Sequence, residues 1–384
     1  MIQVFCKVPF RKLIFLKLSL FAALLPAIDA DAQEVRIGVL GLFHPHQLTL
    51  RPSAAQALVI QAGSENFILE RSSGQDTATI TLSGDRLILR VGNRQVQVSA
   101  VRAVGRGNDA ADFTLAIPGK ISRVYLGVLE VNCAQGVLVP VVRMDLETAV
   151  ASVVAAESDS DSPLEALKAQ AVATRSFFLA AQGRHHNFDF CDTTHCQFLR
   201  APPPLDSNSW QAALATRGLV LAYADRPVAA MFARSCGGRT RTPQDVGLPG
   251  RGYPYFPVVC DYCLRNPWRW TRRVSQAEAA DLARRGEASR LEIDRRTGWD
   301  AVPSNNFTAR SDGKDVILQG AGQGHGIGLC QHGAKAMAQT GSSFREILAH
   351  YYPNTTLARA EQRSDQSASG LWEKKYRGVL ATAP

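Results

Sequence analysis

The chain has 384 residues, of which 46% are hydrophobic and 20% are charged. This length predicts two domains, and the composition excludes a wholly disordered chain, a collagen-like repeat and a charged coiled coil. Lysine and arginine outnumber aspartate and glutamate by 43 to 34. The resulting net charge of +9 suits an anionic polymer such as nucleic acid or cell wall, without distinguishing between them.

Residues 1–32 have the pattern of a secretory signal peptide. Basic residues precede an apolar run from Leu13 to Ile28, and small residues at 30 and 32 supply a cleavage site. The run is shorter than the roughly 20 residues of a membrane-spanning helix, although an uncleaved anchor is the alternative. We expect a mature chain that starts near Gln33, has no transmembrane segment and is secreted or periplasmic, in the cell envelope.

Seven cysteines remain after that expected cleavage: Cys133, Cys191, Cys196, Cys236, Cys260, Cys263 and Cys330. An exported compartment permits disulfides, but an odd number of thiols cannot all pair within one chain. At least one cysteine is therefore free, metal-bound or intermolecular.

Residues 33–120 are predicted to form a β-rich accessory region. Short runs such as EVRIGVL and DRLILRVG alternate apolar and polar residues and are separated by Gly, Ser, Asn and Asp. This alternation is typical of half-buried strands.

A core-facing helix is predicted to begin after Asp145, which is placed to cap it. Apolar residues follow at the i, i+3, i+4, i+7 spacing of one helix face, and Glu157 falls on that face four residues beyond Val153. Burial disfavours a charged carboxylate, so it would raise the pKa of Glu157 toward the value that a general acid needs near neutral pH. The alternative is that the helix ends early and leaves Glu157 solvated.

A second, buried helix is predicted from the sequence PLEALKAQAVATRSFFLAA, with Ser162 as its N-cap and Glu165 completing a capping box. Lys168 and Arg175 lie seven residues apart on one face of this helix. They need an anionic partner, either Glu157 or an acidic ligand, unless both side chains extend to the surface.

The next segment, RHHNFDFCDTTHCQF, is dense in histidine and cysteine. These ligand types match tetrahedral zinc. A disulfide between Cys191 and Cys196 is the alternative in an oxidising compartment, but it leaves three nearby histidines unexplained.

Three later features have more than one interpretation. Cys260 and Cys263 form a CxxC motif that is redox-active, metal-binding or half of two disulfides. Trp268 and Trp270 either stack on sugars or are buried. The glycine-dense loop around His325 lacks both nucleotide-binding glycine patterns, which argues against nucleotide binding. Because the loop has few side chains and presents one imidazole, it is predicted to form the wall of a substrate groove.

Seven of these motifs together resemble one family, the SpoIID/LytB domain of sporulation and cell-wall proteins. They occur in the family's order and are VVAAES, PLEALKAQAVATRSF, FDFCDTTHCQ, ATRGLVL, SCGGRT, GHGIGLCQHGAKAMAQ and FREILAHYYP. The resemblance implies an α+β fold in which a catalytic domain, residues 121–356, packs helices on mixed or antiparallel strands. The β-rich region would precede that domain, and a polar, partly disordered tail, residues 357–384, would follow it.

The resemblance also implies an activity. Members of the family look like lytic transglycosylases, which cleave the MurNAc-GlcNAc linkage of peptidoglycan, preferably in peptide-stripped glycan, and leave a 1,6-anhydro-MurNAc end. By resemblance the catalytic acid is Glu157, and Arg175 is expected nearest to it. The residues implied to line the site are Gln170, Arg175, Ser235, His325 and Gln331.

A zinc ion seen in some members would be held here by His185, Cys191, His195 and Cys196, with His186 as a substitute for His185. The implied zinc would shape the groove and would not activate water.

The chain departs from the family pattern at two cysteines. The family's SSGG is here SCGG, with Cys236, and the serine before the Gln of the glycine loop is here Cys330. These two cysteines either form a disulfide or join Cys260 and Cys263 around a second metal.

Two other classes of function compete with the glycan-cleaving enzyme. One is a non-catalytic protein that binds glycan and enhances a cell-wall amidase, and the other is a zinc hydrolase that uses the Cys/His segment. The expected partners are peptidoglycan glycan strands, together with a cell-wall amidase under the first alternative, and not nucleic acid.

Overall fold

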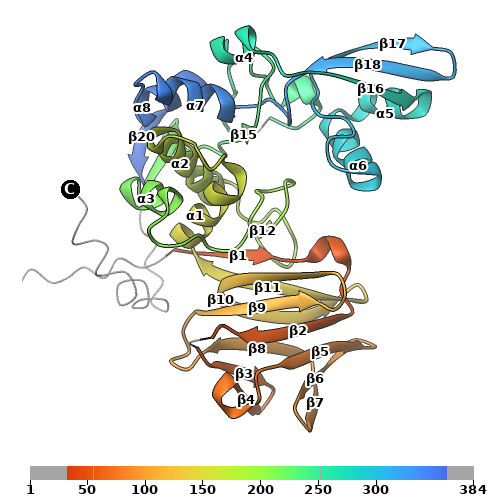
Figure 1. Cartoon of the computed structure of the whole chain (residues 1–384), viewed down its shortest axis with the longest axis vertical. Coiled ribbons are helices and arrows are strands. Elements are labelled where there is room, and N and C mark those ends of the chain that lie inside the picture. The colour runs from red at the N-terminus through yellow and green to blue at the C-terminus, as the bar shows by residue number, and fades with distance from the viewer. Residues whose placement is uncertain (1–32, 55, 251, 361–384) are drawn as a thin grey trace, which may run out of the picture.

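The computed structural model describes residues 33–54, 56–250 and 252–360. The predicted signal peptide and most of the predicted tail lie outside these residues. Among the described residues, no helix is both long and apolar enough to cross a membrane. Helices and largely antiparallel strands occur together (Figure 1), which confirms the predicted α+β class.

A twelve-stranded sheet forms the N-terminal part of the molecule. It is antiparallel apart from the pairing of its first strand with its last. The strands are β1 (Glu34–Gly38), β2 (Gln47–Pro52), β3 (Leu58–Ala62), β4 (Glu65–Leu69), β5 (Ala78–Ser83), β6 (Arg86–Val91), β7 (Arg94–Val98), β8 (Ala100–Gly105), β9 (Ala111–Ile117), β10 (Ile121–Ala134), β11 (Val137–Asp145) and β12 (Phe190–Cys191).

The sheet folds over on itself because β10 is long enough to pair with two different strands. The first half of β10 pairs with β9 and the second half with β8. The sheet therefore continues past residue 120, where the accessory region was expected to end, and stops at Asp145, where the first helix begins.

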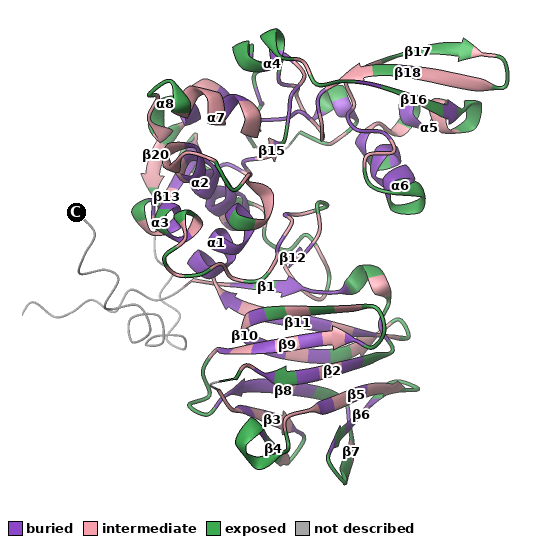
Figure 2. Ribbon diagram, viewed as in Figure 1, coloured by how far each residue is buried: buried purple, intermediate pink, exposed green. Residues whose placement is uncertain are grey.

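Three helices pack at one end of this sheet: α1 (Leu146–Glu157), α2 (Leu164–Ala180) and α3 (Asn208–Ala215). Strand residues such as Leu50 and Phe113 belong to the same buried apolar cluster as Val150 of α1 and Phe178 of α2. The sheet and the helices consequently share one core (Figure 2).

The N-cap predicted for α1 is confirmed, whereas the N-cap predicted for α2 is not. The Asp145 side chain accepts a hydrogen bond from the Thr148 backbone N–H at 2.9 Å, as a predicted N-cap should. The capping box predicted for α2 is wrong, because the helix starts one residue later, with Pro163 at the N-cap position. Glu165 instead accepts hydrogen bonds from the Phe344 backbone and from Lys168.

The C-terminal part surrounds α2, which contacts α7, α8 and β13. A three-stranded sheet is formed by β13, β14 and β20, and β15 pairs in parallel with β19. The elements are β13 (Leu219–Tyr223), β14 (Arg226–Pro227), β15 (Phe232–Ala233), β19 (Leu329–Cys330), α7 (Gln331–Gln339), α8 (Phe344–Tyr351) and β20 (Thr356–Arg359). The predicted tail starts too early, because β20 pairs with β13 as far as Arg359.

Residues 269–321 form a subdomain with its own small core, around Trp270, Leu282 and Leu318. It consists of β16 (Arg269–Ser275), α5 (Gln276–Arg285), α6 (Glu287–Thr297), β17 (Phe307–Asp312) and β18 (Asp315–Ala321). The short helix α4 (Asp261–Arg265) precedes the subdomain and contacts α7. In Figure 1 the strands of this subdomain lie at the opposite end of the molecule from β3 and β4.

Candidate functional site

Glu157 is the last residue of α1, and the helix does not end before it. Val150, Val153 and Val154 on the same helix are fully buried, whereas Glu157 is half-buried. Its Oε1 atom accepts a hydrogen bond from the Phe198 backbone N–H at 3.1 Å. The side chain is therefore held in place and only partly exposed to water.

The environment of Glu157 favours its protonated form. Burial raises the pKa of Glu157 to about 7, although the Phe198 hydrogen bond and the positive charges of Arg234 and Arg200 act in the opposite direction. A carboxyl group with a pKa near neutral pH is present there in both its protonated and its charged form, so it can both donate and accept a proton.

Glu157 lies in a cleft of about 1260 Å³, counting the part open to solvent. The walls come from the segment that follows His195, from β15, from α6 and from the glycine loop around His325. Glu157 and Gln331 also line a smaller adjoining pocket of about 340 Å³. The carboxyl group thus stands between two hollows, and the larger one has room for a ligand.

Gln331 and Gln170 are brought next to Glu157, as the sequence predicts. The Gln331 side chain donates to the Glu157 carbonyl oxygen at 3.1 Å and to Gln170 Oε1 at 3.3 Å. Ser158 Oγ donates to the same Gln170 oxygen at 2.9 Å. Because Gln331 begins α7, these bonds join the end of α1 to the end of the glycine loop.

His325 also lines the cleft, on the glycine loop. Its Nδ1 atom accepts a hydrogen bond from the Ile327 backbone at 3.0 Å, which assigns the proton of the neutral ring to Nε2. Burial lowers the pKa of His325, while the negative charge of Glu287 raises it. The ring is therefore a neutral polar group in the cleft wall near pH 7.

Arg175 does not lie beside Glu157, so that prediction is wrong. The side chain is completely buried, and its guanidinium forms a two-point ion pair with Glu147, at 2.8 and 2.5 Å. The anionic partner is thus on α1, as expected, but at the start of the helix. Lys168 likewise pairs with Glu165 at 2.7 Å.

Ser235 is also removed from the cleft surface. It is buried, and its hydroxyl lies 3.4 Å from Cys263 Sγ. Among the residues that line either hollow in the described structure, neither Ser235 nor Arg175 appears. The sequence motifs of Ser235 and Arg175 border the site, but both side chains are buried beneath the cleft surface and do not face the cleft.

The charges nearest to Glu157 are arginines that the sequence reading missed. Arg234 lines the cleft and pairs with Asp159 at 2.8 Å. Arg200 lies over the Phe198 ring, with 3.8 Å between the guanidinium carbon and the ring centroid. Arg234 directly precedes the SCGG motif, which was the available signal for it.

Neither Trp268 nor Trp270 is among the residues that line the described cleft. Trp270 is buried, and its indole N–H donates to Gly322 O at 3.1 Å, so it serves the subdomain core. Trp268 is exposed. The cleft is instead lined by Trp299, which follows α6 and has 56% of its surface exposed.

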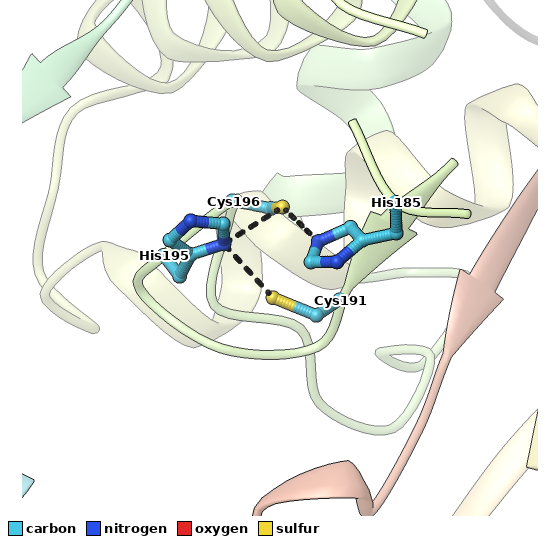
Figure 3. A group of neighbouring side chains, drawn as sticks. All are labelled: His185, Cys191, His195 and Cys196. Carbon is cyan, nitrogen blue, oxygen red and sulfur yellow. Dashed lines mark hydrogen bonds between the residues drawn. The ribbon is translucent and has the colours of Figure 1, made fainter. Parts of the chain in front are cut away.

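The predicted metal ligands His185, Cys191, His195 and Cys196 form a compact group (Figure 3). His185 Nε2 is 3.3 Å from Cys196 Sγ, and His195 Nδ1 is 3.6 Å and 3.7 Å from the two sulfurs. Zinc bonds of about 2.1 Å to nitrogen and 2.3 Å to sulfur place tetrahedral N and S ligands about 3.6 Å apart. The four side chains fit one zinc ion, and His185, not its predicted substitute His186, completes the group.

This group is tied to the cleft through the chain that follows it. His195 and Cys196 line the cleft wall, and Phe198, two residues farther on, donates its backbone N–H to Glu157. Both cysteines are free thiols in this structure, so the alternative disulfide between them is not formed.

The chain is similar in sequence to the SpoIID family and to proteins named for it. Residues 134–223 match the family described as SpoIID: Stage II sporulation protein. An uncharacterized protein of Brachyspira hyodysenteriae is 30% identical over 281 residues, which cover 65% of this chain and 76% of that protein. Stage II sporulation protein D of Bacillus subtilis is 24% identical over 265 residues, 56% of this chain and 75% of its own length.

A shorter similarity links the chain to the amidase enhancer of Bacillus subtilis. The two are 45% identical over 60 residues, which are 16% of this chain and 8% of that protein. The matched stretch is therefore a small part of a much longer protein.

Proposed function

From the premise that this chain belongs to the SpoIID family and has a cell-wall-related role, we propose that it is an exported peptidoglycan lytic transglycosylase. Its substrate would be the MurNAc-GlcNAc linkage of glycan strands stripped of stem peptides, and its product would end in 1,6-anhydro-MurNAc. The observation that supports this proposal is Glu157, a half-buried carboxyl group in the cleft whose pKa is raised to about 7.

One carboxyl group is enough for this reaction. Protonated Glu157 donates its proton to the oxygen that leaves with GlcNAc, and the bond from MurNAc C1 to that oxygen breaks. The C6 hydroxyl of the same MurNAc residue bonds to C1 and closes the anhydro ring, while its proton passes to the Glu157 carboxylate. No water is consumed, and Glu157 returns to its starting state. Glycosidases that use water or a covalent intermediate need a second carboxylate.

The neighbours of Glu157 suit these two proton transfers. While the carboxylate is charged, the Phe198 N–H and the positive charges of Arg234 and Arg200 stabilise it. Burial opposes that charge and favours return of the proton. The two effects together keep the pKa close to neutral pH.

The cleft walls offer groups suited to a sugar chain. Trp299 presents an exposed ring to the cleft, and a ring face can pack against the apolar face of a sugar. Gln331, His325 and Asp300 supply polar atoms along the same cleft.

The zinc ion implied by the family fits His185, Cys191, His195 and Cys196. When bound there it would link four side chains in a tetrahedral arrangement and so rigidify the segment that carries Phe198.

A second candidate function is the non-catalytic glycan-binding enhancer of a cell-wall amidase. The printed name of the Bacillus subtilis relative motivates it. Under this alternative the Glu157→Gln protein still binds denuded glycan and still stimulates an amidase, although it cuts nothing.

The test is digestion of purified, peptide-free glycan strands by the wild type and by Glu157→Gln, with products identified by mass spectrometry. We expect the wild type to release anhydro-MurNAc fragments and the variant to lose about 10²- to 10⁴-fold of that rate. Retained cleavage by the variant contradicts the proposal, and no cleavage by either protein favours the enhancer.

Asp145→Asn is the matched control for this experiment. Burial also raises the pKa of Asp145, to about 6, but this residue caps the opposite end of α1. Asparagine is an equally good cap, so this variant should cleave glycan at the wild-type rate.

A further inference from the structure

Four cysteines outside the Cys/His group meet where the glycine loop, α4 and α7 come together. Cys236 lies in the SCGG turn after β15, Cys260 and Cys263 are in the CxxC motif at the start of α4, and Cys330 caps α7. All four side chains are buried, between 0% and 2% exposed. Their sulfur atoms lie within 4.8 Å of one another.

The spacing of the sulfur atoms matches tetrahedral coordination of one ion. At Zn–S bonds of about 2.3 Å, the sulfurs of a tetrahedron are about 3.8 Å apart. Cys263 Sγ and Cys330 Sγ are 3.5 Å apart, which is too far for a disulfide bond of about 2.05 Å.

Two backbone N–H groups and two hydroxyl groups lie within hydrogen-bond distance of these sulfurs. Cys330 Sγ accepts from the backbone N–H groups of Cys236 and Gly333, both at 3.4 Å. The Tyr351 hydroxyl lies 3.3 Å from Cys260 Sγ, and the Ser235 hydroxyl lies 3.4 Å from Cys263 Sγ. Donors of this kind stabilise thiolates that bind a metal.

The surroundings are otherwise apolar. The four cysteines belong to a buried cluster with residues such as Leu329, Ile347 and Tyr352. A bound cation would balance the charge of four thiolates in such a place, where an uncompensated buried charge is costly. Four sulfur ligands in tetrahedral geometry are typical of zinc or of iron–sulfur sites, and four cysteines are a common ligand set of structural zinc.

We propose that Cys236, Cys260, Cys263 and Cys330 bind a structural zinc ion, separate from the Cys/His group. This assignment accounts for the odd number of cysteines. Four bind here and two belong to the Cys/His group, which leaves Cys133 on β10 as a free thiol.

The second zinc ion would hold in place the segments that carry residues of the cleft wall. Two of its ligands lie close in the chain to residues that line the cleft, since Cys330 precedes Gln331 and Cys236 is two residues after Arg234. Gln331 in turn donates to the Glu157 carbonyl oxygen. These cysteines are positioning residues, and the metal assignment does not depend on the proposed reaction.

The test is the metal content of the purified full-length protein, measured by elemental mass spectrometry. We expect about two zinc ions per chain, one for each tetrahedral group. Cys260→Ser/Cys263→Ser should lose one zinc ion, as should Cys191→Ser/Cys196→Ser, and Cys133→Ser as the control should lose none. In the Cys191→Ser/Cys196→Ser protein, replacing zinc with Co²⁺ should give the visible absorption of a tetrahedral cobalt-thiolate site.

Two results would overturn the proposal. One is a wild-type protein with a single zinc ion and, after denaturation without reductant, a mass lower by four hydrogens, which shows two disulfides. The other is a wild-type protein with one iron and one zinc ion per chain and with the visible absorption of iron bound by four thiolates, which shows iron at this site. Both measurements use the wild type, so they decide the question even if the cysteine variants fail to fold.

Discussion

Replacing Glu157 with Gln should make the protein more stable at neutral and alkaline pH. The folded protein holds the Glu157 proton more tightly than the unfolded chain does, because burial raises the pKa from its ordinary value of 4.5 to about 7. As the pH rises through this interval, the Glu157 carboxyl group of the wild type becomes charged, and burial of that charge lowers the stability of the folded state. The amide of Gln stays neutral and escapes this cost.

The size of the effect follows from the shift. A difference of about 2.5 pKa units at about 1.36 kcal/mol per unit gives about 3 kcal/mol. The stability that protonated Glu157 contributes is fully present below pH 4.5 and is lost as the pH rises through about 7. The difference in free energy of unfolding, Glu157→Gln minus wild type, should therefore increase by about 3 kcal/mol from pH 4 to pH 8.

Urea denaturation of both proteins at a series of pH values measures this difference, and equal m-values would show that the unfolded states are comparable. Asp85→Asn is the control, because Asp85 is an exposed carboxylate in the turn between β5 and β6. A Glu157→Gln difference that is no more dependent on pH than the Asp85→Asn difference would refute the burial of the Glu157 carboxyl group.

Four further outcomes follow. The rate of glycan cleavage should fall as pH rises above about 7, since Glu157 then loses its proton; a rate that keeps rising to pH 9 would contradict this role. Arg234→Gln removes a charge that lowers the Glu157 pKa, so the falling limb of the pH–rate profile should move to higher pH, and a move to lower pH would contradict it. Gly333→Ala places a Cβ atom 2.5 Å from one sulfur of the four-cysteine group, so elemental analysis should find about one zinc ion fewer, and full zinc content would be the contrary result. Glu147→Gln breaks the buried ion pair with Arg175 and should lower the free energy of unfolding by about 3 to 5 kcal/mol. A variant that loses activity while its stability is unchanged would contradict this and would indicate that Arg175 acts at the cleft.

The sequence predicted those parts of the site that depend on local pattern. The spacing of apolar residues placed Glu157 on the buried face of α1, and Asp145 had the chemistry of a cap. The Cys/His segment could be recognised because its four ligands lie within twelve residues of the chain. Short-range periodicity and composition are sufficient for such features.

Features that depend on contacts between distant segments were not accessible in this way. Periodicity indicated that Arg175 needs an anionic partner, but α1 carries both Glu147 and Glu157, and only the packing of α1 against α2 decides between them. Cys236 and Cys330 belong to one cluster although they are 94 positions apart in the chain. The sheet passes residue 120 because the first half of β10 pairs with β9 and the second half with β8, which the sequence of β10 does not reveal.

In the proposed reaction Glu157 moves a proton, while the C6 hydroxyl of the sugar, and not water, bonds to C1. Digestion of peptide-free glycan in water enriched in oxygen-18 tests this directly. We predict products that carry no oxygen-18 and that are lighter by one water than hydrolysis products. Products that carry one oxygen-18 atom at the new reducing end would show that water is the nucleophile and would contradict the account.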